Sequence, residues 1–247
     1  TIQTHLSLNT EEAKNKAINL LKEVGIKDAD TRFDNYPHQF SGGMRQRVVI
    51  SLALCCEPEL LIADEPTTAL DVSIQSQILD LIKRLTKERN LAVILITHDM
   101  GVIAETTDRV AVMKDGVLQQ IDSPSSLYDS PNNLFVAGFI GAPAMNLREA
   151  KLDNAAGEWS LKVGGIKIPL ARGILEKRRS LAGYEGKNIV VGIRPEAMDD
   201  PNVTGTKELP VFSAITELTE ALGSDLLVHF PMDAKAVDAG DPDALKD

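Results

Sequence analysis

The chain has 247 residues, 43% of them hydrophobic, and a formal net charge of −10 at pH 7. It is long enough to bury an ordinary core in one large domain or two modest ones. The excess of acidic over basic residues excludes a nucleic-acid partner that is bound through a broad basic surface. The longest apolar runs fall far short of the ~20 residues that cross a bilayer.

Two helices are predicted near the start of the chain. Residues 10–24 place apolar side chains on one helical face behind a threonine N-cap, Thr10. After a proline-broken loop, Ser41-Gly42-Gly43 leads into a second helix, from Met44 to about Cys56. A helix N-terminus of this kind offers unpaired N–H groups and the positive end of the helix dipole, which favour an anion. The alternative is a glycine turn that only begins a helix.

Two short apolar runs, residues 60–63 and 91–97, are typical of buried parallel strands. Residues 72–89 between them have helical spacing, which gives the strand, helix, strand order of a right-handed crossover. The predicted fold class is therefore α/β. Residues 109–121 predict a hairpin around Asp115-Gly116, which is expected to close the sheet.

Beyond the hairpin, Ser123-Pro124 and Ser130-Pro131 are expected to start two short helices. Residue usage changes near Leu147, where we predict a domain boundary. Alternating stretches at residues 159–163, 189–193 and 226–230 then indicate a small β-rich module.

Chemistry-bearing residues follow the two predicted strands. Asp64 and Glu65 end the first strand, and open α/β sheets bind ligands at such strand ends. One carboxylate can hold Mg²⁺ while the other takes a proton from an attacking water, as phosphoryl transfer requires. His98 ends the next strand and can reach the same γ-phosphate. The alternatives are an ordinary acidic loop and a histidine capped by Asp99.

In order and spacing, these motifs closely resemble the ATPase family of ABC transporters. The matching segments are residues 41–47, 60–67, 69–71 and 97–99. The resemblance implies that Asp64 is the Walker B aspartate that binds Mg²⁺, Glu65 the catalytic base and His98 the switch histidine. It further implies that Asp71 is the D-loop aspartate, and that Ser41, Gly42 and Gly43 form the signature motif that contacts ATP held by a facing subunit.

The resemblance also implies an architecture and a set of partners. Residues 1–147 would be the downstream part of a P-loop-type ATPase domain, with a helical subdomain to about residue 56, and residues 148–247 a truncated OB-like regulatory domain. The implied activity is Mg²⁺-dependent ATP hydrolysis that drives solute uptake. The implied partners are two membrane permease subunits, a second ATPase subunit in a head-to-tail dimer and, indirectly, an extracytoplasmic solute-binding protein. The implied location is the cytoplasmic side of the bacterial inner membrane.

The first and second parts of the sequence resemble two different subfamilies. Residues 36–72 look like the ATPases of dipeptide and oligopeptide importers, and that match runs to about Asp108. From Arg109 onward, notably at residues 133–147 and 192–196, the sequence is similar to importers of the maltose, glycerol-phosphate and trehalose type. The sequence leaves open whether the transported solute is a peptide or a sugar. It also leaves open whether the chain is a natural recombinant of the two subfamilies. Arg194 and Glu196 are interpreted as a local surface ion pair.

The sequence departs from the family in the motif that binds the nucleotide. The sequence contains no Gly-x-x-x-x-Gly-Lys-Ser/Thr loop, and residues 163–167 lack its spacing. We therefore expect this chain alone neither to bind ATP tightly nor to hydrolyse it. We expect that roughly one hundred upstream residues or more are missing, or that another chain supplies them.

Two other functions remain open. The first is a non-catalytic fragment that acts as a permease-binding or regulatory module. The second is a DNA-repair or chromosome-maintenance ATPase, which is disfavoured because neither a long coiled coil nor a zinc module interrupts the sequence.

Overall fold

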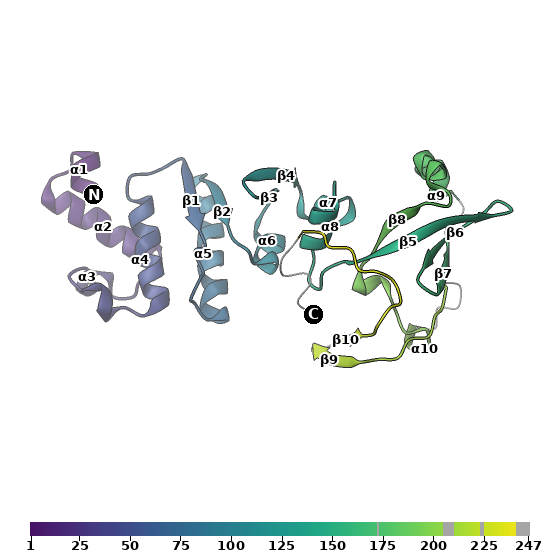
Figure 1. Cartoon of the computed structure of the whole chain (residues 1–247). Helices are drawn as coiled ribbons and strands as arrows, with labels where there is room; N and C mark the ends of the chain where they lie inside the picture. The colour runs from purple at the N-terminus through teal and green to yellow at the C-terminus, as the bar shows by residue number, and fades with distance from the viewer. Residues whose placement is uncertain (172, 205–209, 223–224, 241–247) are drawn as a thin grey trace. The chain divides into compact units, whose positions relative to one another are not determined.

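The structure is a computed structural model that describes residues 1–171, 173–204, 210–222 and 225–240. The chain divides into two compact units, Thr1–Asp108 and Arg109–Asp247 (Figure 1). Residues 241–247, at the end of the predicted regulatory domain, lie outside the described part of the chain. The domain boundary near Leu147 stays a prediction.

The first unit begins with helices. They are α1 (Ile2–Leu6), α2 (Thr10–Glu23), α3 (Ala29–Arg32), the 3₁₀ turn η1 (Pro37–Gln39) and α4 (Gly42–Leu54). The predicted N-cap of α2 is wrong by one residue. Asn9 caps this helix, because its side-chain oxygen accepts the N–H groups of Glu11 and Glu12 while the Glu12 carboxylate accepts the N–H of Asn9.

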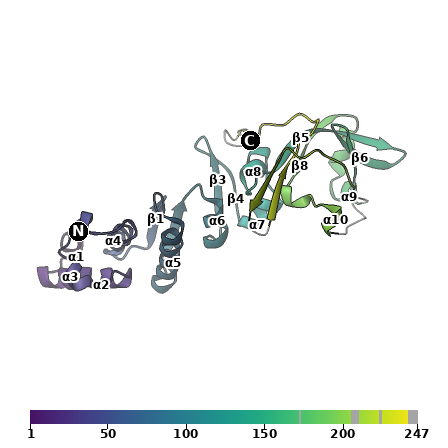
Figure 2. The same ribbon diagram turned by 90° about the horizontal axis from the view of Figure 1, so that it is seen from below.

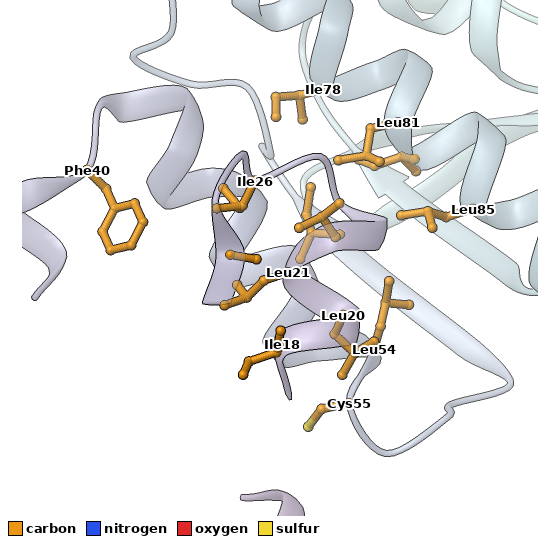
Figure 3. Packing of buried hydrophobic residues seen from close by; sticks show 14 of the residues in the cluster. Ile18, Leu20, Leu21, Ile26, Phe40, Leu54, Cys55, Ile78, Leu81 and Leu85 are labelled. Atoms are coloured by element: carbon orange, nitrogen blue, oxygen red, sulfur yellow. The ribbon is translucent and has the colours of Figure 1, made fainter. Parts of the chain in front are cut away.

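The core of the first unit lies where α2 and α4 meet α5 (Val72–Arg89). Val24, Leu54, Ile78 and Leu85 are almost completely buried, and Figure 3 shows side chains of this cluster converging from the three helices. The amphipathic spacing of α2 and α5 accounts for this packing, because each helix buries one apolar stripe. The helix predicted at residues 72–89 is confirmed.

A parallel pair of strands completes the first unit, together with α6 (Met100–Thr106). Strands β1 (Leu60–Asp64) and β2 (Ala92–Ile96) pair in register, with Ile62 opposite Ile94. The predicted parallel, adjacent strands are therefore confirmed, and α5 connects them along one side (Figures 1 and 2).

The prediction that both strands are buried is wrong. On one face, Leu61 and Val93 pack against the helical core. On the other face, Leu60, Ile62, Ile94 and Ile96 are 46%, 61%, 50% and 48% exposed. The reason is that the described residues of this unit supply a covering layer on one side of the sheet only.

The second unit contains a hairpin, two short helices and further strands. Strands β3 (Val110–Lys114) and β4 (Val117–Asp122) form the predicted hairpin, in which Asp115 and Gly116 both have positive φ. The expectation that it closes the parallel sheet is wrong, because β3 and β4 pair with each other as a separate two-stranded sheet.

The two short helices of this unit are α7 (Pro124–Asp129) and α8 (Leu134–Phe139). Ser123 caps α7 as predicted. Helix α8 starts later than the predicted Ser130-Pro131, because the Asn133 side chain accepts the Val136 N–H and caps the helix there.

The β-rich module predicted after Leu147 is present. Its antiparallel sheet has the order β7-β6-β5-β8, made by β5 (Asn146–Ala155), β6 (Glu158–Val163), β7 (Ile166–Pro169) and β8 (Asn188–Ile193). Strands β9 (Leu218–Leu222) and β10 (Asp225–His229) form a separate antiparallel pair. The remaining short turns are α9 (Ile174–Lys177), η2 (Arg179–Tyr184), η3 (Pro195–Ala197) and α10 (Pro201–Thr204).

Arg194 is not the surface ion-pair residue that the sequence suggested. Its guanidinium donates to the carbonyl oxygens of Ile140 and Tyr128, both at 2.6 Å, and stacks 3.6 Å from the centroid of the Tyr128 ring. Burial lowers the pKa of this guanidinium. Arg194 therefore ties the end of β8 to α7 and α8 within the second unit.

Candidate active site

The carboxyl ends of β1 and β2 bring Glu65 and His98 into contact. The backbone N–H of Glu65 donates to the carbonyl of Ile96, which continues the strand pairing by one residue. Nδ1 of His98 then lies 3.1 Å from Oε1 of Glu65. The two side chains are 44% and 80% exposed for Glu65 and His98 respectively, so both can meet a ligand from solvent.

Glu65 is held by its backbone and by a hydroxyl. Its φ of 44° lies in the left-handed region, where a residue with a Cβ is uncommon. The Thr68 hydroxyl donates to Oε2 of Glu65 at 2.8 Å. The hydrogen bond from Thr68, followed by that from His98, lowers the pKa of the Glu65 carboxyl. This carboxylate is therefore ionised near neutral pH and able to accept a proton.

Sequence reasoning missed Thr68. The available signal was a hydroxyl three residues after the glutamate, in a segment that a proline forces to turn. The Thr68 N–H donates to the Glu65 carbonyl at 3.2 Å, so the turn that places the hydroxyl is closed by the backbone itself.

Asp64, the predicted magnesium ligand, is the last residue of β1 and is exposed. Strand alternation places it on the face that also carries Leu60 and Ile62. Among the described residues, no three histidine, cysteine or acidic side chains cluster as a metal site. A single exposed carboxylate nevertheless fits Mg²⁺, which commonly keeps several waters and uses one or two protein carboxylates plus substrate phosphates.

The predicted signature motif begins α4. Ser41 is the N-cap, its hydroxyl accepts the Met44 N–H at 3.4 Å, and its side chain is exposed. The helix starts at Gly42 rather than at the predicted Met44. A Cβ added at Gly43 would lie 2.6 Å from Cγ2 of Ile74, so the start of α4 approaches α5 too closely for a side chain there.

Asp71 begins α5. Its Oδ1 accepts the Ser73 hydroxyl at 2.7 Å and the Ile74 N–H at 2.9 Å, and these bonds lower the pKa of the Asp71 carboxyl. The carboxylate is thus occupied in capping the helix. Its implied D-loop role stays a prediction.

The alternative in which Asp99 caps His98 is wrong, because the Asp99 carboxylate has other partners. Its Oδ1 accepts the N–H groups of Gly101 and Val102 at the start of α6, and its Oδ2 accepts from Nε2 of Gln75 at 2.9 Å. Gln75, which the sequence did not single out, therefore links the first turn of α5 to the segment that carries His98.

Across the part of the chain that the structure describes, no helix is both long and apolar enough to traverse a bilayer.

Two segments of the chain match models of known families. Residues 1–68 match the family model described as ABC transporter, and residues 141–198 match that of the MalK OB fold domain. Residues 1–68 are therefore similar to ABC transporter ATPases and residues 141–198 to the MalK OB fold, in agreement with the predicted α/β class and with the resemblance to this family.

Three curated relatives are similar to the first part of the chain. The dipeptide transport ATP-binding protein DppD of Bacillus subtilis is 48% identical over 149 residues, covering 60% of this chain and 44% of DppD. The oligopeptide transport ATP-binding protein AmiE of Streptococcus pneumoniae is 50% identical, covering 57% of this chain and 40% of AmiE. The glutathione import ATP-binding protein GsiA of Escherichia coli K12 is 49% identical, covering 58% of this chain and 23% of GsiA. The chain spans less than half the length of these relatives.

Solved structures give a partial likeness. The bacterial ABC transporter cassette MJ0796 is 36% identical with a TM-score of 0.41, covering 47% of this chain and 49% of that structure. The cbiO1 protein of Clostridium perfringens is 34% identical with a TM-score of 0.44, covering 49% and 47% respectively.

Proposed function

We propose that the chain is the downstream part of an ATP-hydrolysing subunit that drives a bacterial ABC importer. The observation that carries the proposal is the contact between Glu65 and His98 at the ends of two neighbouring parallel strands. A carboxylate held ionised by two hydrogen bonds is a suitable base for water, and the adjacent imidazole is a suitable partner for a leaving phosphate.

In the proposed reaction, the Glu65 carboxylate accepts a proton from the water that attacks the γ-phosphorus of ATP. A new oxygen–phosphorus bond forms as the bond to the β-phosphate oxygen breaks, and ADP and phosphate are the products. His98 contacts the γ-phosphate and stabilises the charge that develops on it. Asp64 would hold Mg²⁺, which supplies charge neutralisation when bound.

The remaining predicted residues act on a second nucleotide. Ser41, Gly42 and Gly43 would offer their hydroxyl and backbone N–H groups to the γ-phosphate of ATP held by a facing ATPase subunit, and Asp71 would lie at that interface. The exposed N-terminus of α4 supports this role, because an anion can reach it. Catalysis would then require two ATPase subunits.

The nucleotide loop that binds the remaining phosphates would come from polypeptide outside these 247 residues, which contain no Gly-x-x-x-x-Gly-Lys-Ser/Thr sequence. We infer that the chain alone has little or no ATPase activity. The complete subunit would bind two permease subunits at the cytoplasmic face of the membrane and, through them, serve an extracytoplasmic solute-binding protein.

A peptide is the solute that the relatives favour, since the names of DppD and AmiE specify dipeptide and oligopeptide transport. The resemblance of the sequence from Arg109 onward to importers of the maltose, glycerol-phosphate and trehalose type favours a sugar. Uptake of labelled dipeptide and of labelled maltose, by cells in which the complete gene is the sole importer ATPase, would separate the two.

The first test joins the segment of DppD that precedes its matched region to this chain and measures phosphate release. We expect Glu65→Gln to lower turnover by about 10²- to 10⁴-fold, because the general base is lost. ATP binding should persist and trap a closed dimer. Glu88→Gln, a matched change on the exposed side of α5, should leave turnover unchanged. Persistent fast turnover in Glu65→Gln would contradict the role of Glu65.

A non-catalytic role as a permease-binding or regulatory module is the second candidate, favoured by the lack of a nucleotide loop in the sequence. It predicts that the joined protein binds permease without hydrolysing ATP. Measurable phosphate release that depends on Glu65 would eliminate it.

A further inference from the structure

The two cysteines of the chain, Cys55 and Cys56, lie next to each other at the end of α4. Their sulfur atoms are 3.6 Å apart, and either thiol can donate to the other. Cys55 is the C-cap residue of α4, and the chain continues through Glu57, whose φ of 55° is left-handed, toward β1. The turn between these two elements therefore brings two thiols together, and the proposed hydrolysis of ATP uses neither.

The two thiols differ in burial. Cys55 is 2% exposed and belongs to the hydrophobic core of the first unit, whereas Cys56 is partly exposed at the margin of that core. In Figure 3 the Cys55 sulfur points away from the side chain of Leu54. The Cys55 N–H donates to the Leu52 carbonyl at 3.4 Å, which is long for a backbone hydrogen bond, so the turn is held weakly there. A reagent from solvent therefore meets Cys56 first and reaches Cys55 through it.

The separation of the sulfur atoms limits what the pair can bind. A disulfide requires about 2.05 Å, and an ion with two collinear sulfur bonds of ~2.3 Å would require about 4.6 Å. Two such bonds that meet near the tetrahedral angle place the sulfur atoms about 3.8 Å apart. The observed 3.6 Å is closest to this last arrangement. The geometry therefore suits one soft atom that is held through two bent bonds.

The number of ligands narrows the choice of that atom. Structural zinc takes four protein ligands, and the described residues contain no group of three histidine, cysteine or acidic side chains that could hold a metal ion. Trivalent arsenic forms three bonds, arranged as a pyramid. An arsenical that carries one carbon substituent therefore has two positions left, and two thiols fill them.

The protonation of Cys55 favours the same chemistry. Burial, followed by the contact with Cys56, raises the pKa of the Cys55 thiol, so this group stays protonated near neutral pH. Disulfide exchange is slow at such a group, because the thiolate is the nucleophile. Condensation with an arsenical consumes the thiol proton in forming water and does not need a preformed thiolate.

We propose that Cys55 and Cys56 form a binding site for a trivalent organoarsenical. The arsenic of an arsonous acid, R–As(OH)₂, bonds first to Sγ of Cys56 and then to Sγ of Cys55. Two arsenic–oxygen bonds break, two arsenic–sulfur bonds form, and the two thiol protons leave with the hydroxyl groups as two water molecules. Arsenic stays trivalent, so the reaction needs neither an oxidant nor a reductant.

The test adds phenylarsine oxide, which hydrates to such an acid in water, to the full chain under non-denaturing conditions. Intact mass spectrometry should detect one phenylarsenic group per chain and the loss of both thiol hydrogens. A dithiol should remove this group, whereas a monothiol at the same thiol concentration should not, because the second bond forms at a high effective concentration. Cys56→Ser and Cys55→Ser each leave one thiol, so their affinity should be lower by about 10²-fold or more.

Glu57→Gln is the matched control, since it changes the next residue of the turn and keeps both thiols. Its affinity should equal that of the unchanged chain. Circular dichroism should show that Cys56→Ser, at a partly exposed position, keeps the fold, so the comparison stands even if Cys55→Ser unfolds the core. The proposal is overturned if the arsenical binds only after unfolding in urea, or if Cys56→Ser binds as tightly as the unchanged chain. A purified chain that is two hydrogens lighter, and that a reductant restores, would show a disulfide and would also overturn it.

Discussion

The Glu65 side chain receives two hydrogen bonds although almost half of it is exposed to solvent. Its backbone also occupies the left-handed region, which costs free energy and persists only where the surroundings impose it. The turn from Glu65 to Thr68 therefore fixes the direction of the carboxylate before any ligand arrives.

We predict that Thr68→Val raises the pKa of Glu65 toward the ordinary glutamate value, because the hydroxyl of Thr68 is the largest cause of its lowering. Carbon-detected NMR titration of the Glu65 carboxyl measures this change, and Thr68→Ser should preserve the lowered value. Since the folded-state pKa lies below the unfolded value, the group's contribution to stability is complete above the ordinary glutamate pKa. It is lost as the pH falls through the folded value. An unchanged titration in Thr68→Val would show that the hydrogen bond has no effect.

We predict that Gly43→Ala destabilises the first unit by about 1–3 kcal/mol, because the new methyl group overlaps Ile74. Gly42→Ala is the control, since a Cβ there would meet Leu70 at an ordinary 3.5 Å. Urea denaturation of both variants measures the difference. Adding Ile74→Ala to Gly43→Ala should recover part of the loss, and equal destabilisation by the two glycine variants would contradict the argument.

At the scale of elements, the sequence predicted the long helices and the strand pairing well. Apolar periodicity specified α2 and α5, and a single crossover helix made β1 and β2 parallel neighbours. The contact between Glu65 and His98 followed from that adjacency. Helix caps were predicted less well, because Asn9 and Asn133 compete with nearby residues that have similar capping propensity.

Contacts between distant segments were beyond sequence patterns. The sequence around Arg194 does not indicate that its guanidinium joins β8 to α7 and α8, since its partners are backbone carbonyls 54 and 66 residues away. The same holds for Gln75, whose amide reaches Asp99, 24 residues further along the chain. The bond from Thr68 to Glu65 is local, so its signal was present in the sequence although it was missed.

We predict that Arg194→Lys destabilises the second unit by about 1–3 kcal/mol. A lysine ammonium cannot donate to both the Ile140 and Tyr128 carbonyls and also stack as a plane on the Tyr128 ring. Denaturation followed by fluorescence of Trp159, on β6 of that unit, measures the loss. Arg179→Lys, at an exposed position of the same unit, should have no comparable effect.

For the whole molecule, composition predicted a folded acidic chain, but it did not indicate that one face of the β1–β2 sheet is exposed to solvent. The strands at residues 60–63 and 91–97 have the apolar character of buried strands, and sequence alone does not show which layers are present to bury them. The prediction was wrong for one face because burial depends on polypeptide outside each strand.

We predict that association of the chain is strongest near pH 5.0, where its net charge approaches zero. Light scattering across the range from pH 4 to pH 8 measures this. Ile62→Asp should reduce the maximum, because it places a charge among the exposed side chains of Leu60, Ile94 and Ile96 on the β1–β2 sheet. Leu52→Asp, at a similarly exposed position on α4, should reduce it less. Equal effects of the two changes would show that charge alone controls association.

The close packing of Gly43 on Ile74 has a mechanical consequence. Ile74 adjoins Gln75, whose amide holds Asp99, and Asp99 adjoins His98. We therefore expect a displacement of the start of α4 to move the first turn of α5 and, through one hydrogen bond, the segment that bears the imidazole. On this path, the serine-glycine end of α4 and the histidine are mechanically coupled without a ligand between them.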